Sequence, residues 1–164
     1  MRSDPIRNSW KGFLAGAIGG LVASFAMTQF YVLLQKAESS ARQGTEDSTV
    51  KAVGAISQNV FHHKLTPQQK RIAGPMMHYG FGASVAAIYG AVAEFAPLVR
   101  TGWGMPFGAG VWLGAHVIAV PALGLSEPVT ESTPRKEAAE FGAHLVYGVV
   151  VEGLRCLLRR RALR

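Results

Sequence analysis

The stretch Met76–Pro97, MMHYGFGASVAAIYGAVAEFAP, decides the fold, because it is long enough to cross a bilayer and carries an ionisable residue near each end. Residues placed four apart on a helix lie on the same face. Here that face holds only small or ionisable residues, namely His78, Gly82, Ala86, Gly90 and Glu94. Exposing a charged side chain to lipid costs about 3 kcal/mol near the centre of a helix, so this face is predicted to pack against other helices.

The composition of the whole chain also indicates a membrane protein. Of its 164 residues, 49% are hydrophobic and only 16% are charged, whereas soluble domains carry about 25% charged residues. The formal net charge is +7, but the cations lie mainly beside the apolar segments and near the C-terminus, which argues against nucleic-acid binding. Cys156 is the only cysteine, so an intramolecular disulfide and a cysteine metal cluster are excluded.

Three further apolar segments are long enough to span the membrane. Together they predict four transmembrane helices, over residues 12–34, 76–97, 104–124 and 136–158. The first apolar run exceeds the core of a signal peptide, which is about 7 to 15 residues long, so we expect it to be retained as a span. The predicted fold is an all-α integral membrane protein in which residues 1–164 form a single membrane domain.

The polar segment of residues 35–75, between the first two spans, carries helical signals of its own. Thr66 and Gln69 are spaced as a capping box, and Pro67 suits the first position of a helix. We expect this short helix to end at residues 74–75, a Gly-Pro pair, before the second span begins. A separate amphipathic helix is predicted from apolar residues at helical spacing, namely Val50, Val53, Ile56 and Val60.

Small residues spaced by four predict close packing between the spans, because they let neighbouring backbones approach. A glycine-packed bundle with spare small-residue faces is also expected to form homo-oligomers. The glycines assigned to helix packing are Gly12, Gly16, Gly20, Gly82, Gly90 and Gly148.

The sequence contains a weak internal repeat. The second and fourth spans share the pattern Y-G-x-V-x-E, at residues 89–94 and 147–152. The first and third spans align through Gly12 and Gly16, which fall on Gly104 and Gly108. These matches predict two helical hairpins related by an axis along the membrane normal, although helices that pack on glycine can share such patterns without duplication.

The distribution of cations predicts the orientation. With four spans, both termini lie on the same side, and that side receives arginines in short segments, densest near the C-terminus. Cytoplasmic segments carry the excess of Lys and Arg, so both termini are predicted to be cytoplasmic. Histidines then lie in the outer half of the bilayer and carboxylates in the inner half.

Five ionisable residues in the predicted spans are candidates for a polar path that carries protons. Histidine titrates near neutral pH, and burial of a glutamate favours its protonated form. The alternative is structural: the histidines hydrogen-bond across helices, and Glu152 pairs with Arg155 or Arg159. The candidates are His78, His116, His144, Glu94 and Glu152.

Other functions are open on the same residues. His116 and His144 lie on facing helices and are a candidate pair of axial ligands for a b-type haem. A non-conducting scaffold that binds a partner through residues 35–75 is a further alternative. No enzyme is predicted, because the sequence has no nucleophile elbow, P-loop, dinucleotide-binding glycine motif or H-E-x-x-H. No metal site or cofactor is assigned, and the predicted partners are the lipid bilayer and further copies of the same chain.

Four segments resemble the YagU-like family of bacterial inner-membrane proteins, over about residues 10–160. The resemblance implies a small four-span protein grouped under a domain of unknown function, with histidines matching His78, His116 and His144. A contribution to survival in acid has been proposed for that family, without an established activity, so a role in acid or envelope stress is the expectation here. The segments are Leu65–Ala83, Tyr89–Glu94, Trp112–Pro128 and His144–Glu152.

Overall fold

The structure is a computed structural model, and it describes residues 5–37, 66–122 and 132–161. All regular structure in these ranges is helical, so the all-α prediction is confirmed for them. The long helices are α1 (Pro5–Ala37), α3 (Pro67–Phe95) and α6 (Pro134–Arg161). Four shorter helical elements follow α3 directly along the chain: η1 (Pro97–Gly104), α4 (Met105–Val111), η2 (Trp112–Ala119) and α5 (Val120–Ala122). The predicted amphipathic helix around residues 50–60 lies outside the described residues.

Three helical segments are long and apolar enough to cross a membrane: Ser9–Leu34, Pro97–Ala122 and Pro134–Arg160. They contain most of the predicted first, third and fourth spans. The predicted second span, residues 76–97, lies almost wholly in α3, which does not reach the same apolarity. Glycines, His78 and Glu94 dilute the apolar residues of that helix.

The start of α3 agrees with the sequence, but the expected break at residues 74–75 is wrong. Thr66 accepts a hydrogen bond from the Gln69 backbone N–H at 3.3 Å, and the Gln69 side chain accepts one from the Thr66 N–H at 2.8 Å. The helix then continues through Pro75 to Phe95. A proline removes one backbone donor near the carbonyl of residue 71, and both positions are exposed, so water can satisfy that carbonyl.

The connection between α3 and α4 is a 3₁₀ segment with three consecutive left-handed residues. Gly102, Trp103 and Gly104 have φ values of 66°, 56° and 80°. Such angles suit glycine but strain a tryptophan. A side chain at Gly104 would also meet the carbonyl oxygen of Gly148, so glycine is required there on both grounds.

The third apolar segment is not a regular α-helix. Residues 112–119 are π-helical, and this segment ends two residues before Pro121. Pro121 lacks the N–H that would bond the carbonyl of Val117, and the helix widens just before it. The distortion therefore falls on the turn that carries His116.

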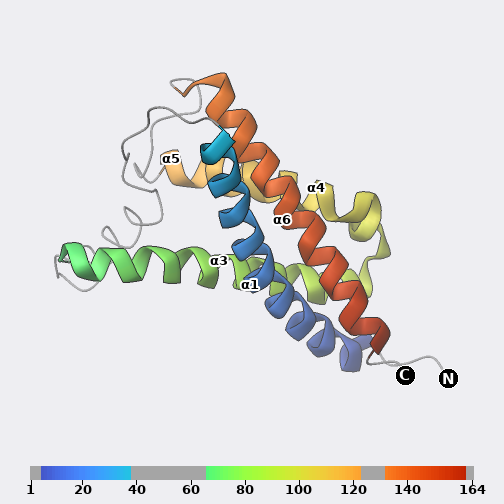
Figure 1. The fold of residues 1–164 in the computed structure, drawn as a ribbon. Helices are drawn as coiled ribbons and strands as arrows, with labels where there is room; N and C mark the ends of the chain where they lie inside the picture. Colours follow the sequence, from blue (N-terminus) through green and yellow to red (C-terminus); the bar gives the residue numbers. More distant parts are fainter. Residues whose placement is uncertain (1–4, 38–65, 123–131, 162–164) are drawn as a thin grey trace.

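The helices form two packed pairs, one of which includes the short helix α4 (Figure 1). In one pair α1 packs extensively on α3, and in the other α6 packs on α4. The pairs join where α1 lies along α6, while α3 and α6 barely touch. The start of α1 and the end of α6 lie near each other in Figure 1.

Both crossings bring glycine backbones together at positions that the repeat aligns. Side chains added at Gly12 or Gly90 would each meet the carbonyl oxygen of the other residue, between α1 and α3. Side chains added at Gly104, the last residue of η1, or at Gly148 of α6 would do the same. Since Gly12 aligns with Gly104 and Gly90 with Gly148, the two contacts are equivalent, which supports the predicted repeat.

The contact between α1 and α3 continues towards the other end of both helices. A side chain at Gly16 would meet the carbonyl oxygen of Ala86, and one at Gly20 would lie 2.6 Å from the carbonyl oxygen of Gly82. Gly82 in turn faces the hydroxyl of Ser24, whose buried oxygen has no hydrogen-bond partner among the described residues. All six glycines assigned to packing from the sequence are buried.

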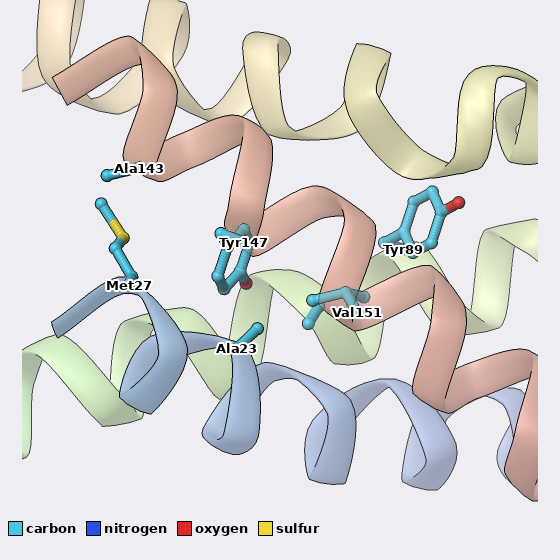
Figure 2. Close-up of a cluster of buried hydrophobic side chains, with 7 residues drawn as sticks. Ala23, Met27, Tyr89, Ala143, Tyr147 and Val151 are labelled. Atoms are coloured by element: carbon cyan, nitrogen blue, oxygen red, sulfur yellow. The ribbon is translucent and has the colours of Figure 1, made fainter. Parts of the chain in front are cut away.

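The interior is small or polar, and the exterior is apolar. The buried cluster in Figure 2 consists mostly of alanines and two tyrosines around Val151 and Met27. Large apolar side chains point outwards instead, such as Leu33, Ile88 and Leu98, which are 65%, 61% and 78% exposed. A continuous apolar exterior is typical of a surface that contacts lipid.

Candidate functional site

Four of the five candidate path residues fall into two separate clusters, and His78 lies in neither of them. Glu94 and Glu152 lie in a cluster with two arginines, which we call the arginine cluster. His116 and His144 lie in a second cluster, which we call the histidine cluster, and His78 is half-buried on α3 with its ring edge-on to Tyr79. His144 and Glu152 are eight residues apart on α6, so the clusters are separated by about 12 Å.

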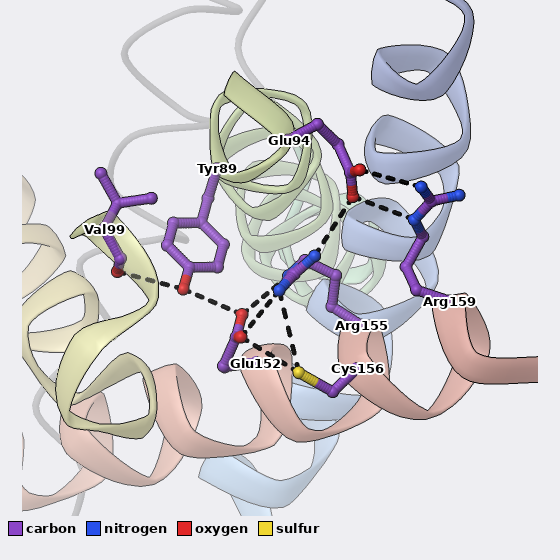
Figure 3. Close-up of polar contacts among 7 residues, drawn as sticks. All are labelled: Tyr89, Glu94, Val99, Glu152, Arg155, Cys156 and Arg159. Atoms are coloured by element: carbon purple, nitrogen blue, oxygen red, sulfur yellow. Dashed lines mark hydrogen bonds and ion pairs between the residues drawn. The ribbon is translucent and has the colours of Figure 1, made fainter. Parts of the chain in front are cut away.

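The arginine cluster is centred on Arg155 (Figure 3). The Arg155 guanidinium donates to both carboxylate oxygens of Glu152, at 2.7 and 2.8 Å, and to Glu94 at 3.2 Å. Arg155 and Glu152 are only 2% and 3% exposed. The pairing of Glu152 with Arg155 is the one that the structural alternative predicted. Arg155 thereby joins two carboxylates that the repeat makes equivalent.

Further contacts complete this cluster. Arg159 donates to both oxygens of Glu94, each at 2.9 Å, and links α6 to α3. The Cys156 thiol donates to Glu152 at 3.1 Å, and the Tyr89 hydroxyl lies 3.0 Å from Glu152. Both carboxylates are therefore paired with guanidinium groups through charge-assisted hydrogen bonds.

An aromatic layer separates the two clusters. Phe107 stacks on Tyr89 with ring centroids 4.1 Å apart, and its ring lies 5.8 Å from that of Tyr147. The Tyr147 hydroxyl donates to the Gly82 carbonyl at 2.6 Å and so points to α3. The residues described here therefore do not form a continuous chain of hydrogen bonds from His144 to Glu152.

The histidine cluster joins the π-helical turn to α6. His116 Nε2 lies 3.1 Å from Glu137, and both side chains are mostly buried. His144 Nδ1 donates to the Glu140 carbonyl at 2.8 Å, and the two imidazole centroids are 6.3 Å apart. The Glu140 carboxylate accepts a hydrogen bond from the hydroxyl of Tyr31 on α1. Three elements thus meet at this cluster.

The geometry bears on the haem and metal alternatives. His116 Nε2 is directed to Glu137, which leaves only its Nδ1 for a haem iron. Within residues 5–37, 66–122 and 132–161, no three His, Cys, Asp or Glu side chains are placed to share a metal ion. The partner-binding alternative depends mainly on residues 38–65, which lie outside the described ranges.

Several residues of both clusters were missed in the sequence. Glu137 and Glu140 lie in the first turns of α6, where carboxylates are also expected as favourable partners of the helix dipole. Tyr31 pairs with Glu140 from 109 residues away, so no local spacing indicates the contact. The Y-G-x-V-x-E pattern did contain a signal, because its tyrosine and glutamate meet across the two copies as Tyr89 and Glu152.

Comparison with known proteins gives one match. A family model described as "Protein of unknown function (DUF1440)" matches residues 38–153. No curated protein matches the chain, and no solved structure does. The matched range covers most of the chain, including both clusters except for Arg155, Cys156, Arg159 and Tyr31.

Proposed function

Since the chain belongs to the DUF1440 family of proteins of unknown function, we propose its role from its own residues: a four-span, non-enzymatic protein of the bacterial inner membrane that responds to acid. Three of the four spans are assigned to the helical segments that are long and apolar enough to cross a membrane. We add α3 as the fourth because α1 packs along it through glycine contacts, so both helices must share one environment. Cytoplasmic segments of membrane proteins carry an excess of Lys and Arg, and α6 ends in several arginines. With four spans, both termini are then cytoplasmic. The resemblance to YagU-like proteins supports the same assignment.

The observation that carries the acid response is the pairing of His116 with Glu137 beside a second histidine. A proton on His116 strengthens its attraction to Glu137. A second proton on His144 would place two cations about 6 Å apart, with a repulsion of about 2 to 3 kcal/mol at an effective dielectric constant of 20. His78, Glu140 and Tyr31 are the other titratable groups near this pair. Acid therefore changes the contact between the π-helical turn and α6.

Trp112 is expected to report this protonation. Its ring stacks on His116 with centroids 6.3 Å apart and an interplanar angle of 22°, and a protonated imidazole quenches a neighbouring indole. In a variant with Trp10→Phe and Trp103→Phe, we expect Trp112 fluorescence to fall as the pH is lowered from about 8 to 5, the range in which histidine titrates. His116→Gln should remove the transition, and His144→Gln should shift its midpoint. A transition that His116→Gln leaves unchanged would contradict the proposal.

Proton conduction along all five residues is the second candidate function. His144 and Glu152 lie two turns apart on one face of α6, and two buried tyrosines occupy the layer between them. Both carboxylates are paired with arginines, and the described residues form no continuous chain of hydrogen bonds between the clusters, so a response without conduction is favoured.

Proton flux in liposomes separates the two candidates. With a pH-sensitive dye inside the vesicles and an imposed pH gradient, we expect the parent protein to conduct no more than empty liposomes. His144→Ala and Glu152→Gln should then make no difference. Flux in the parent that both substitutions abolish, with folding intact, would establish the conduction path instead.

A further inference from the structure

An apolar groove lies between α3 and the third apolar segment. It has a volume of about 360 Å³ and is lined by Phe81, Val85, Phe107, Gly110, Val111 and Ala115. The lining is almost entirely apolar, and the groove is open to the surface. Among the described residues, α3 makes at most sporadic contacts with α4 and η2.

The internal repeat shows why this interface is open. Its counterpart is the contact between α1 and α6, which is closed, with Gly19 against Val151. The alignment that places Gly12 on Gly104 places Ala15 on Phe107 and Gly19 on Val111. Gly19, which lies against Val151 of α6, is therefore replaced by Val111, and the small Ala15 is replaced by Phe107. Both larger side chains line the groove. The groove therefore coincides with a sequence difference between the two hairpins.

Charge at one end of the molecule indicates what the groove binds. The segment η1 joins the two helices that line the groove, and it carries Arg100, which is exposed. Glu94 and Glu152, the only carboxylates of the described chain at this end, are already paired with Arg155 and Arg159. Trp103, 71% exposed in the same segment, is the kind of residue that anchors at a membrane interface. This end is complementary to an anionic headgroup.

The distances suit one leaflet of a bilayer. Val85 precedes the end of α3 by ten residues, and Gly110 follows the start of α4 by five. At a rise of 1.5 Å per residue, the groove lies about 8 to 15 Å from η1. One leaflet of a hydrocarbon core of about 30 Å is about 15 Å thick, so an acyl chain from a headgroup at η1 reaches the groove.

We propose that this groove binds an acyl chain of an anionic phospholipid from the inner leaflet, with the headgroup phosphate against Arg100. The inference rests on the proposed membrane-spanning arrangement. It adds a specific lipid ligand, which that arrangement alone does not require.

Brominated lipids test the site, because bromine on an acyl chain quenches nearby tryptophan. Trp112 follows the groove residue Val111, so the full-length protein with Trp10→Phe and Trp103→Phe reports on the groove. In phosphatidylcholine vesicles we expect brominated phosphatidylglycerol to quench Trp112 with at least about a threefold higher relative binding constant than brominated phosphatidylcholine. Gly110→Leu should abolish this preference by filling the groove. Arg100→Gln should reduce it while chain quenching persists.

Gly114→Leu is the matched control. Side chains added at Gly110 or Gly114 would have nothing within 4 Å, so both variants should fold, but only Gly110 lines the groove. Equal quenching by both lipids, or equal effects of both leucines, would overturn the lipid site. A change of oligomeric mass with either leucine would assign this face to a second copy instead. Inorganic phosphate that competes as well as lipid would show that the chain is not recognised. Failure of the parent to insert into vesicles would refute the proposed function itself.

Discussion

Replacing Arg155 by methionine is expected to lower the free energy of unfolding by about 3 to 5 kcal/mol, the usual cost of removing one partner of a buried ion pair. Arg155 donates to Glu152 and to Glu94, and the first of these carboxylates is almost fully buried. Without the guanidinium, Glu152 keeps only the Cys156 thiol and the Tyr89 hydroxyl as close partners in the described chain. Neither of them carries a positive charge.

Unfolding in detergent micelles, followed by thermal melting or by denaturant, measures this effect. Arg160→Met on the same helix is the control, because Arg160 is exposed. The double variant Arg155→Met with Glu152→Gln should recover much of the loss, since no charge is then left unpaired at that position. Arg155→Lys should recover less, because an ammonium group cannot reproduce the two parallel hydrogen bonds to Glu152. Equal melting of Arg155→Met and Arg160→Met would show that the cluster does not stabilise the fold.

The two contacts of Arg155 differ in how well they could be predicted from the sequence. Glu152 and Arg155 lie one turn apart on one helix, so their pairing follows from local spacing. The bond from Arg155 to Glu94 joins positions 61 residues apart and depends on how α6 lies against α3. Only the crossing of helices, which spacing does not define, brings those groups together.

The start of α3 was predicted correctly from the sequence, but an expected helix end and a change of helix type were not. The capping residues Thr66 and Gln69 fixed the start of α3, because capping depends on neighbours in the chain. The expected stop at Pro75 failed, since an exposed proline near the start of a helix can leave its orphaned carbonyl to water. The π-helical segment at residues 112–119 had no periodic signal, because it changes the winding of a helix in which every residue of the segment except His116 is apolar.

The candidate path was the least predictable feature. Five ionisable residues stand out in the apolar segments of the sequence, yet spacing along each helix could not show that Phe107 and two tyrosines lie between the histidines and the carboxylates. Phe107 comes from the third segment and inserts between α3 and α6. Aromatic residues in a membrane span look alike in sequence whether they face lipid or fill an interior layer.

The other large effect is expected at the helix crossings. Gly90→Leu should lower stability by about 3 kcal/mol or more, or prevent assembly, because overpacking is most costly where the neighbour cannot move. A side chain at Gly90 would meet the carbonyl oxygen of Gly12 and would lie 3.0 Å from the Cα of Gly16. Both are backbone atoms of α1, so the steric clash can be removed only if α1 and α3 move apart along their whole contact.

Gly80→Leu isolates this cause from the change in helix propensity. Gly80 lies on the same helix, and a side chain there would have nothing within 4 Å. Both substitutions gain about 0.8 kcal/mol or less of helix propensity, so their difference in melting temperature reports the contact with α1 alone. Gly148→Leu should behave like Gly90→Leu, because its side chain would meet the backbone of Gly104 at the equivalent crossing. If Gly90→Leu and Gly80→Leu melt alike, the crossing of α1 and α3 is misplaced; if only Gly148→Leu is tolerated, the two hairpins do not pack by the same rule.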